Sequence, residues 1–247
     1  MLALRGLCTL IFLVLTLPAT AQQSPGGPIA PFVDQGPEDG AFLAFRDRLL
    51  AAVIAQDINM IVTMSSPNIF LEFRGEGTPG RVGHTAFRQN LIGEGENTSG
   101  PLLLYGQNAP NILRQARKAA YLDALENVLR GGGTFGDDNA SFTAPYLSQV
   151  NIHGPDVSAY DAYFTTFEGT ALLDRPSIWG AATARLPYGE AVDLIAPAYG
   201  TRFFEIRRAN GDTGFVDEQH LRPWLGYAAV FARQNGAWSM TAFNWQF

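Results

Sequence analysis

The stretch FEGTALLDRPSIWGAATARLPYGEAVDLIAPAYGTRFFEIRRANGDTGFVDEQHLRP, residues 167–223, indicates the fold of the C-terminal part of the chain. Short apolar runs in this stretch are separated by turn-forming sequences: Arg175-Pro176-Ser177, Pro187-Tyr188-Gly189, residues 197–200 and Asn210-Gly211. Short strands at this spacing are typical of a small antiparallel barrel. We therefore expect an all-β barrel over residues 166–224.

The same stretch resembles a bacterial SH3-type domain. Gly211 to Val216 (GDTGFV) matches the family's G-x-x-G-[WF]-V hairpin, and residues 203–207 (FFEIR) match W-Y-K-V-R with Phe203 in place of Trp. Residues 186–195 resemble the L-x-x-G-x-x-V-x-V segment. Residues 173–177 match the first strand and its R-x-x-P-S turn, without the gap between Arg and Pro. The resemblance implies a barrel that docks peptide.

Aromatic residues are frequent in this part of the chain. In SH3-like barrels some aromatic side chains fill the core, and others line a surface groove that takes extended peptide. We expect Phe203, Phe215 and Val216 in the core. The candidate ligand-binding residues of the groove are Trp179, Tyr188, Tyr199 and Trp224. Packing of these aromatic residues against the N-terminal region is the alternative interpretation.

The first residues have the pattern of a secretory signal. Arg5 precedes an apolar run, residues 10–17, and Ala19-Thr20-Ala21 forms a small-residue cleavage site. The run is shorter than the ~20 residues that a membrane-spanning helix needs. We expect a signal peptide over residues 1–21, cleavage near Ala21-Gln22, and a periplasmic or secreted protein with no membrane insertion after cleavage. Residues 22–38 are rich in Gly, Pro and Gln, which predicts a flexible leader.

Residues 39–165 are predicted to form an α+β domain. The first helix is expected over residues 38–56, because Phe42, Phe45, Leu49 and Val53 recur at helical spacing while Arg46 lies off that stripe. Asp57 is a candidate cap of a second helix. Further helices are expected over residues 85–92 and 116–130, and strands over 69–74 and 101–105. Residues 142–146 and 156–164 are expected to be loop-like.

Residues 225–247 are expected to form a terminal β-hairpin. Asn235-Gly236 separates residues 227–233 from 237–243, and Asn-Gly is a strong signal for a two-residue hairpin turn. Two such apolar strands left unpaired would favour aggregation. The hairpin is therefore expected either to pair with the barrel or to pack against the N-terminal half. The predicted fold class is α+β, with a mixed N-terminal region packed against the barrel.

The order of motifs also resembles a group of uncharacterised secreted bacterial envelope proteins with an SH3-like part. The matching segments are residues 132–135 (GGTF), 142–146 (FTAPY) and 227–243. This resemblance implies no activity.

The sequence offers little for catalysis. The only cysteine, Cys8, lies in the predicted signal, which excludes a thiol nucleophile and a thiolate metal site from the mature chain. His84, His153 and His220 are far apart along the chain, and no metal or serine-nucleophile motif occurs. We expect neither a cofactor nor a metal. A net charge of −6 gives no general attraction to nucleic acid.

Two functional hypotheses and a structural one follow. The first is a non-catalytic binding protein whose SH3-like part docks a peptide, either the stem peptide of murein (peptidoglycan) or an envelope protein partner. The second is a cell-wall hydrolase that uses carboxylates such as Glu72 and Glu76, or Asp137 and Asp138, held ~5–9 Å apart. In the third, the barrel is purely structural and the terminal hairpin covers its groove.

Overall fold

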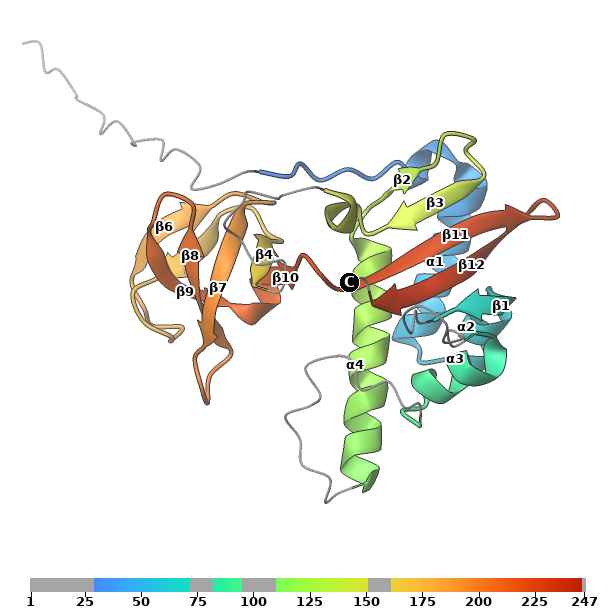
Figure 1. Cartoon of the computed structure of the whole chain (residues 1–247), viewed down its shortest axis with the longest axis horizontal. Coiled ribbons are helices and arrows are strands. Elements are labelled where there is room, and N and C mark those ends of the chain that lie inside the picture. The colour runs from blue at the N-terminus through green and yellow to red at the C-terminus, as the bar shows by residue number, and fades with distance from the viewer. Residues whose placement is uncertain (1–28, 72–81, 95–109, 151–160, 246–247) are drawn as a thin grey trace, which may run out of the picture.

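The computed structural model describes residues 29–71, 82–94, 110–150 and 161–245. Within these residues the chain forms two sheets with helix α4 between them, and further helices pack on the five-stranded sheet (Figure 1). The α+β fold class is confirmed. The predicted signal peptide, residues 22–28, the strand candidate at 101–105, Glu72, Glu76 and His153 lie outside the described residues.

The helices begin and end close to where the apolar spacing predicted. Helix α1 is capped by the Asp39 carboxylate, which accepts from the backbone N–H groups of Ala41 and Phe42. Asp57 caps α2 in the same way through Met60 N–H. Helix α4 begins six residues before the predicted Ala116. The helices are α1 (Gly40–Ile54), α2 (Ile58–Thr63), α3 (His84–Leu91) and α4 (Pro110–Arg130), with short 3-10 turns at Gly36–Glu38, Tyr146–Gln149 and Glu218–His220.

The five-stranded sheet combines the first and last strands of the chain. Its order is β1-β12-β11-β3-β2, with β1 parallel to β12 and the other neighbours antiparallel. The terminal hairpin thus pairs with the N-terminal region on both of its edges. The strands are β1 (Ser65–Phe70), β2 (Thr134–Phe135), β3 (Ser141–Ala144), β11 (Tyr227–Gln234) and β12 (Ala237–Trp245).

The hairpin turn has the expected chemistry. Asn235 and Gly236 have φ angles of 51° and 81°, which are left-handed values that suit an Asn-Gly pair between two strands. The turn fixes the register of β11 on β12, apart from a shift between Val230 and Phe231.

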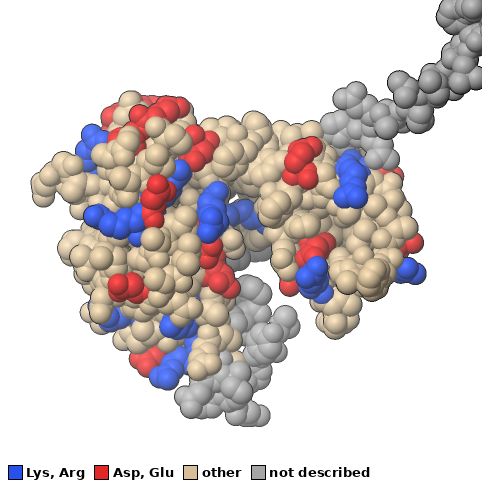
Figure 2. Space-filling model, turned by 180° about the vertical axis from the view of Figure 1, so that it is seen from behind, with Lys and Arg blue, Asp and Glu red and all other residues tan. Residues whose placement is uncertain are grey.

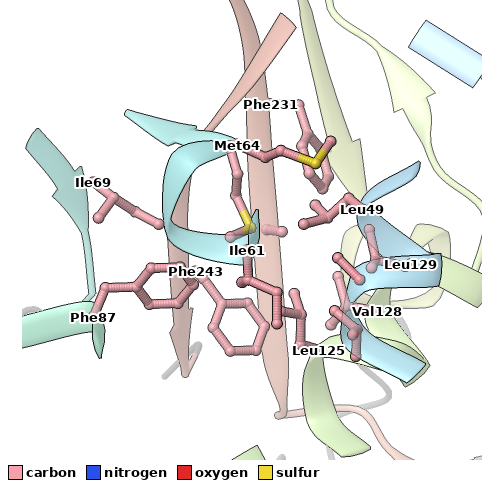
Figure 3. Close-up of a cluster of buried hydrophobic side chains, with 14 of the residues drawn as sticks. Leu49, Ile61, Met64, Ile69, Phe87, Leu125, Val128, Leu129, Phe231 and Phe243 are labelled. Atoms are coloured by element: carbon pink, nitrogen blue, oxygen red, sulfur yellow. The ribbon is translucent and has the colours of Figure 1, made fainter. Parts of the chain in front are cut away.

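The main hydrophobic core lies between the five-stranded sheet and the helices that pack on it. Figure 3 shows Leu49 of α1, Ile61 of α2 and Val128 of α4 meeting Phe231 and Phe243 of the hairpin. All five side chains are buried. The stripe predicted on α1 (Phe42, Phe45, Leu49, Val53) and the face predicted on α4 (Tyr121, Leu125, Val128, Leu129) are both buried in this core.

The seven-stranded sheet is formed by one continuous part of the chain. Its order is β10-β4-β7-β8-β9-β5-β6, and every neighbouring pair is antiparallel. The sheet is strongly curved (Figure 1), but no pairing among the described residues joins β10 to β6, so it is not a closed barrel. The strands are β4 (Ala162–Thr165), β5 (Thr170–Leu173), β6 (Ala182–Leu186), β7 (Ala191–Pro197), β8 (Phe203–Arg208), β9 (Thr213–Asp217) and β10 (Leu221–Pro223).

The curved sheet has its own core of Leu172, Ala184, Leu186, Val192, Ile206, Val216 and Leu221. Phe203 and Val216 are buried as predicted, whereas Phe215 is only half-buried. Glu190 and Arg208 form a buried bidentate ion pair within this sheet, with nitrogen–oxygen distances of 2.8 and 3.2 Å. Because both charges are paired and hydrogen-bonded, their burial is tolerated.

Two segments that were expected to be loop-like are strands. Residues 141–144 form β3 and residues 162–165 form β4. Neither is long enough to show a clear alternation in the sequence, so their partners β11 and β7 define them. The predicted boundary at residue 166 therefore leaves β4 outside the sheet to which it belongs.

Residues 29–38, predicted to be part of a flexible leader, lie across both sheets. Ala30 N–H donates to Gly189 O of the curved sheet, and Gln35 N–H donates to Gly133 O beside β2. Asp34 forms a bidentate ion pair with Arg46, at 2.7 and 2.9 Å. We refer to residues 29–38 as the strap. Arg46 was expected on the exposed side of α1, but it is only 8% exposed because its ion pair with Asp34 holds it against the strap.

Candidate functional site

Two of the predicted groove residues lie on exposed loops. Trp179, between β5 and β6, is 79% exposed, and Tyr199, between β7 and β8, is 95% exposed. Trp179 N–H bonds to Ser177 Oγ, and its carbonyl accepts from Arg175. The large exposed area of these side chains leaves them available to a partner, but neither lines the large cleft described below.

The other two predicted residues lie where the curved sheet meets the N-terminal region. Tyr188 and Trp224 both pack against a small buried cluster of Ala30, Leu147 and Phe164. The Trp224 indole N–H donates to Val150 O at 2.8 Å. Tyr188 makes an edge-to-face contact with Phe32 of the strap, with ring centroids 5.7 Å apart. For Trp224 this is the packing role that the alternative interpretation described.

A large cleft lies between α4 and the curved sheet, with a volume of about 910 Å³. Figure 2 shows the molecule hollowed between its two halves. We call this the central cleft. Its lining includes Ala120, Ala124 and Asn127 of α4, Tyr163 of β4, Phe204 of β8, and Leu221 and Arg222 of β10.

The α4 wall of the cleft is made of small side chains. Tyr121, Leu125 and Val128 point into the main core, so the neighbouring positions on the helix face the curved sheet. Two of those positions are Ala120 and Ala124, which line the cleft. Because alanine side chains are short, they leave space between the helix and the curved sheet unfilled.

The opposite wall is aromatic and apolar. Tyr163 and Phe204 make an edge-to-face contact with ring centroids 5.9 Å apart, and Leu221 lies beside them in the cleft lining. Burial, with a smaller contribution from the Asp161 carboxylate, raises the pKa of Tyr163. The phenol is therefore neutral at physiological pH, and the pair of Tyr163 and Phe204 carries no charge.

Arg222 lies in the cleft near the C-terminal end of α4. Its guanidinium donates to Asn127 O at 3.3 Å and to Tyr227 O at 3.1 Å. The helix C-terminus, with its partial negative charge, favours a cation there. No carboxylate of the described residues pairs with Arg222, unlike Arg46, Arg130 and Arg208. Two carbonyls use only part of the five N–H donors of a guanidinium.

Burial lowers the pKa of Arg222 to about 10, while the nearby Tyr188 phenol raises it. The side chain is therefore still charged at neutral pH. A charge that is desolvated without a counter-charge costs free energy. An anion in the central cleft would offset this cost.

The other charged residues of the cleft differ in depth. Arg117 is half-buried and forms no ion pair among the described residues, whereas Asp123 and Glu218 are exposed at the rim. Burial and the neighbouring Glu126 raise the pKa of Asp123. Arg130 also lines the cleft, but it is exposed and paired with Glu126. The two arginines without a described carboxylate partner, Arg117 and Arg222, are thus less exposed than the carboxylates of the lining.

Asn90 lines the cleft and carries an unpaired polar atom. The residue is 6% exposed, and its amide nitrogen donates to Tyr121 Oη at 3.3 Å. Its Oδ1 is buried and has no hydrogen-bond partner among the described residues. A buried amide oxygen without a partner is costly.

The candidate catalytic residues that the structure describes do not form a recognisable catalytic site. His84 Nε2 is 3.0 Å from Ser65 O, and the His220 ring packs against Phe167 with centroids 4.9 Å apart. Asp137 and Asp138 are exposed in the turn between β2 and β3. Among the described residues no group of three or more His, Cys, Asp or Glu side chains could hold a metal ion, and no helix is long and apolar enough to cross a membrane.

Comparison with known proteins gives little guidance. No family model matches the chain, and no curated protein matches it. A crystal structure from Xanthomonas campestris, described as a calcium/calmodulin dependent protein kinase II association domain, aligns over 88% of this chain and 96% of its own, with 12% identity and a TM-score of 0.24. At that TM-score the likeness carries no argument about fold or function.

Of the four predicted groove residues, only Tyr188 lines the central cleft. The rest of the cleft was not predicted, because its walls come from α4, β4, β8 and β10, which are distant along the chain. Arg222 lies in the ordinary run Leu221-Arg222-Pro223, which has no motif. The alanine-rich side of α4 is a feature that many helices share.

Proposed function

We propose that this protein is a non-catalytic peptide-binding protein of the bacterial cell envelope, and that the central cleft holds the peptide. The observation that carries the proposal is the composition of the cleft. It combines an aromatic wall, a wall of small residues and partly buried arginines without carboxylate partners. Ligand sites are typically concave and mainly apolar, with a few polar groups that fix orientation.

The proposal includes the identity of the curved sheet as a bacterial SH3-type domain. The supporting features are the motifs of residues 173–177, 203–207 and 211–216. The first lies at the end of β5 and in the loop after it, the second on β8, and the third in the β8–β9 turn and on β9. Domains of this type use aromatic side chains to dock extended peptide. Here Tyr163 and Phe204 present such a surface to the cleft, while Trp179 and Tyr199 offer a second, exposed one.

The predicted signal peptide supports a proposed location outside the cytoplasm, and we propose two sources of peptide there. One is the stem peptide of murein, and the other is an envelope protein partner. Co-sedimentation with purified murein sacculi, at low and at moderate salt, separates them. Binding that persists at moderate salt favours murein, and no binding favours the protein partner.

The direct test uses a pool of randomised tetrapeptides with free termini. The mature protein is equilibrated with the pool, separated by gel filtration, and the retained peptides are identified by mass spectrometry. We expect retention of a subset, with no change in peptide mass. Retention of no peptide would overturn the proposal, and cleaved peptides would favour the hydrolase hypothesis.

A matched pair of variants locates the site. Ala120 lines the central cleft, whereas its neighbour Ala119 is exposed and lies outside the lining. Ala120→Trp should fill the cleft and abolish retention, and Ala119→Trp should not. Equal retention by the two variants would move the site to another surface, such as the Trp179 and Tyr199 loops. If the cleft and those loops both proved dispensable, the purely structural interpretation of the curved sheet would gain support.

A further inference from the structure

The Arg222 guanidinium is a charged group of the central cleft that has no carboxylate partner among the described residues. It is fixed by hydrogen bonds to Asn127 O and Tyr227 O, so its position does not depend on a ligand. Several of its N–H donors remain outside these two bonds. Arginine pairs with carboxylates through two parallel N–H···O bonds, a geometry that a fixed guanidinium favours.

The surroundings of Arg222 favour a small anion over a bulky one. A Cβ atom on Gly131 would lie 3.5 Å from an Arg222 terminal nitrogen, and Pro145 closes the same side of the cleft. Tyr188 lines the same cleft as Arg222. A neutral phenol can donate a hydrogen bond to an anion.

The rest of the lining is mainly apolar. It contains Tyr163, Phe204 and Leu221, together with Ala120 and Ala124 of α4. The cleft therefore suits a peptide that has a negatively charged group beside an apolar side chain.

We infer that the central cleft recognises a peptide by its free C-terminal carboxylate, which pairs with Arg222 while an apolar side chain packs on Tyr163 and Phe204. This inference rests on the proposed peptide-binding function and specifies which part of the peptide is read. It excludes the interior of a longer chain as the principal ligand, because an internal peptide has no carboxylate of its backbone to offer.

The test compares two randomised tetrapeptide pools that differ only at their C-terminus, one as free acids and one as amides. We expect wild-type protein to retain the free acids and to bind the amides about thirtyfold or more weakly, as for loss of one partner of a desolvated charge pair. Equal retention of acids and amides would overturn the inference and leave peptide binding in place. Retention of neither pool would overturn peptide binding itself.

Variants of Arg222 provide the second measurement. Arg222→Met should remove the preference for free acids, and Arg222→Lys should retain part of it, because lysine keeps the charge but not the paired geometry. Arg207, exposed on β8 outside the cleft lining, gives the matched control Arg207→Met, which should behave as wild type. An acid preference that survives in a folded Arg222→Met protein would contradict the assignment. Should that variant fail to fold, the comparison of acids with amides on wild-type protein still decides.

Discussion

The C-terminal hairpin should contribute several kcal/mol to the stability of the N-terminal core, as one side chain, Phe231, illustrates. Phe231 of β11 is fully buried, and its ring centroid lies 5.5 Å from that of Phe42 and 6.0 Å from that of Phe45. An aromatic side chain buries about 150–250 Å². At about 25 cal/mol per Å² this burial is worth about 4–6 kcal/mol. An alanine side chain at this position would still bury part of that area. We expect Phe231→Ala to lower the free energy of unfolding by about 3–5 kcal/mol.

Urea unfolding followed by tryptophan fluorescence measures this change. Trp238 is a suitable reporter because it is 7% exposed and its ring lies 5.0 Å from the Phe42 ring. Phe167→Ala is the control: Phe167 is 56% exposed, and its loss should change the free energy of unfolding by less than about 1 kcal/mol.

A double-mutant cycle tests the contact itself. The combined Phe42→Ala, Phe231→Ala protein should depart from additivity by about 0.5–3 kcal/mol, because the two rings share one cavity. A loss below about 1 kcal/mol for Phe231→Ala, or strict additivity with Phe42→Ala, would refute the conclusion that the hairpin completes the N-terminal core.

Two further predictions concern the strap and α1. Gly189 has a φ of 75°, and a Cβ atom there would collide with Ala30 O, so Gly189→Ala should release the strap and speed hydrogen exchange at Ala30 N–H. Gly200→Ala, with a φ of 72° and open space around it, bears only the backbone strain and should leave that exchange unchanged. The backbone N–H of Phe42 and, less strongly, the Arg233 guanidinium lower the pKa of Asp39 below its ordinary 3.8. The ionised Asp39 carboxylate therefore stabilises the folded state at pH values above the pKa of Asp39 in the unfolded chain. This stabilisation is lost as the pH falls through the lower pKa of Asp39 in the folded state. The difference in unfolding free energy between wild type and Asp39→Asn should shrink below about pH 4, and a constant difference would contradict this.

Features set by neighbouring residues could be predicted from the sequence. The α1 stripe, the Asp57 cap and the Asn235-Gly236 turn each depend on a few consecutive residues, and each occurs where the pattern indicated. Local periodicity determines such elements because the helix or turn repeats over the same few residues.

Features that depend on distant partners could not be predicted. In the pairing of β1 with β12, Ser65 lies opposite Met240, and the local sequence of neither strand predicts its partner. Arg46 was expected to be exposed because its partner, Asp34, belongs to a segment of low complexity. The central cleft was missed because it too depends on distant segments. It forms between α4 and the curved sheet, and no local pattern shows how these two elements lie relative to each other.

The measurement that tests the proposed site most directly is a backbone amide chemical-shift map of the mature protein during titration with a retained free-acid peptide. We expect the largest shifts at Ala120, Tyr163 and Arg222, which line the central cleft, and none at the exposed Trp179 and Tyr199. Shifts concentrated at Trp179 and Tyr199, with the cleft residues unchanged, would contradict the proposal and restore the outer loops as the binding surface.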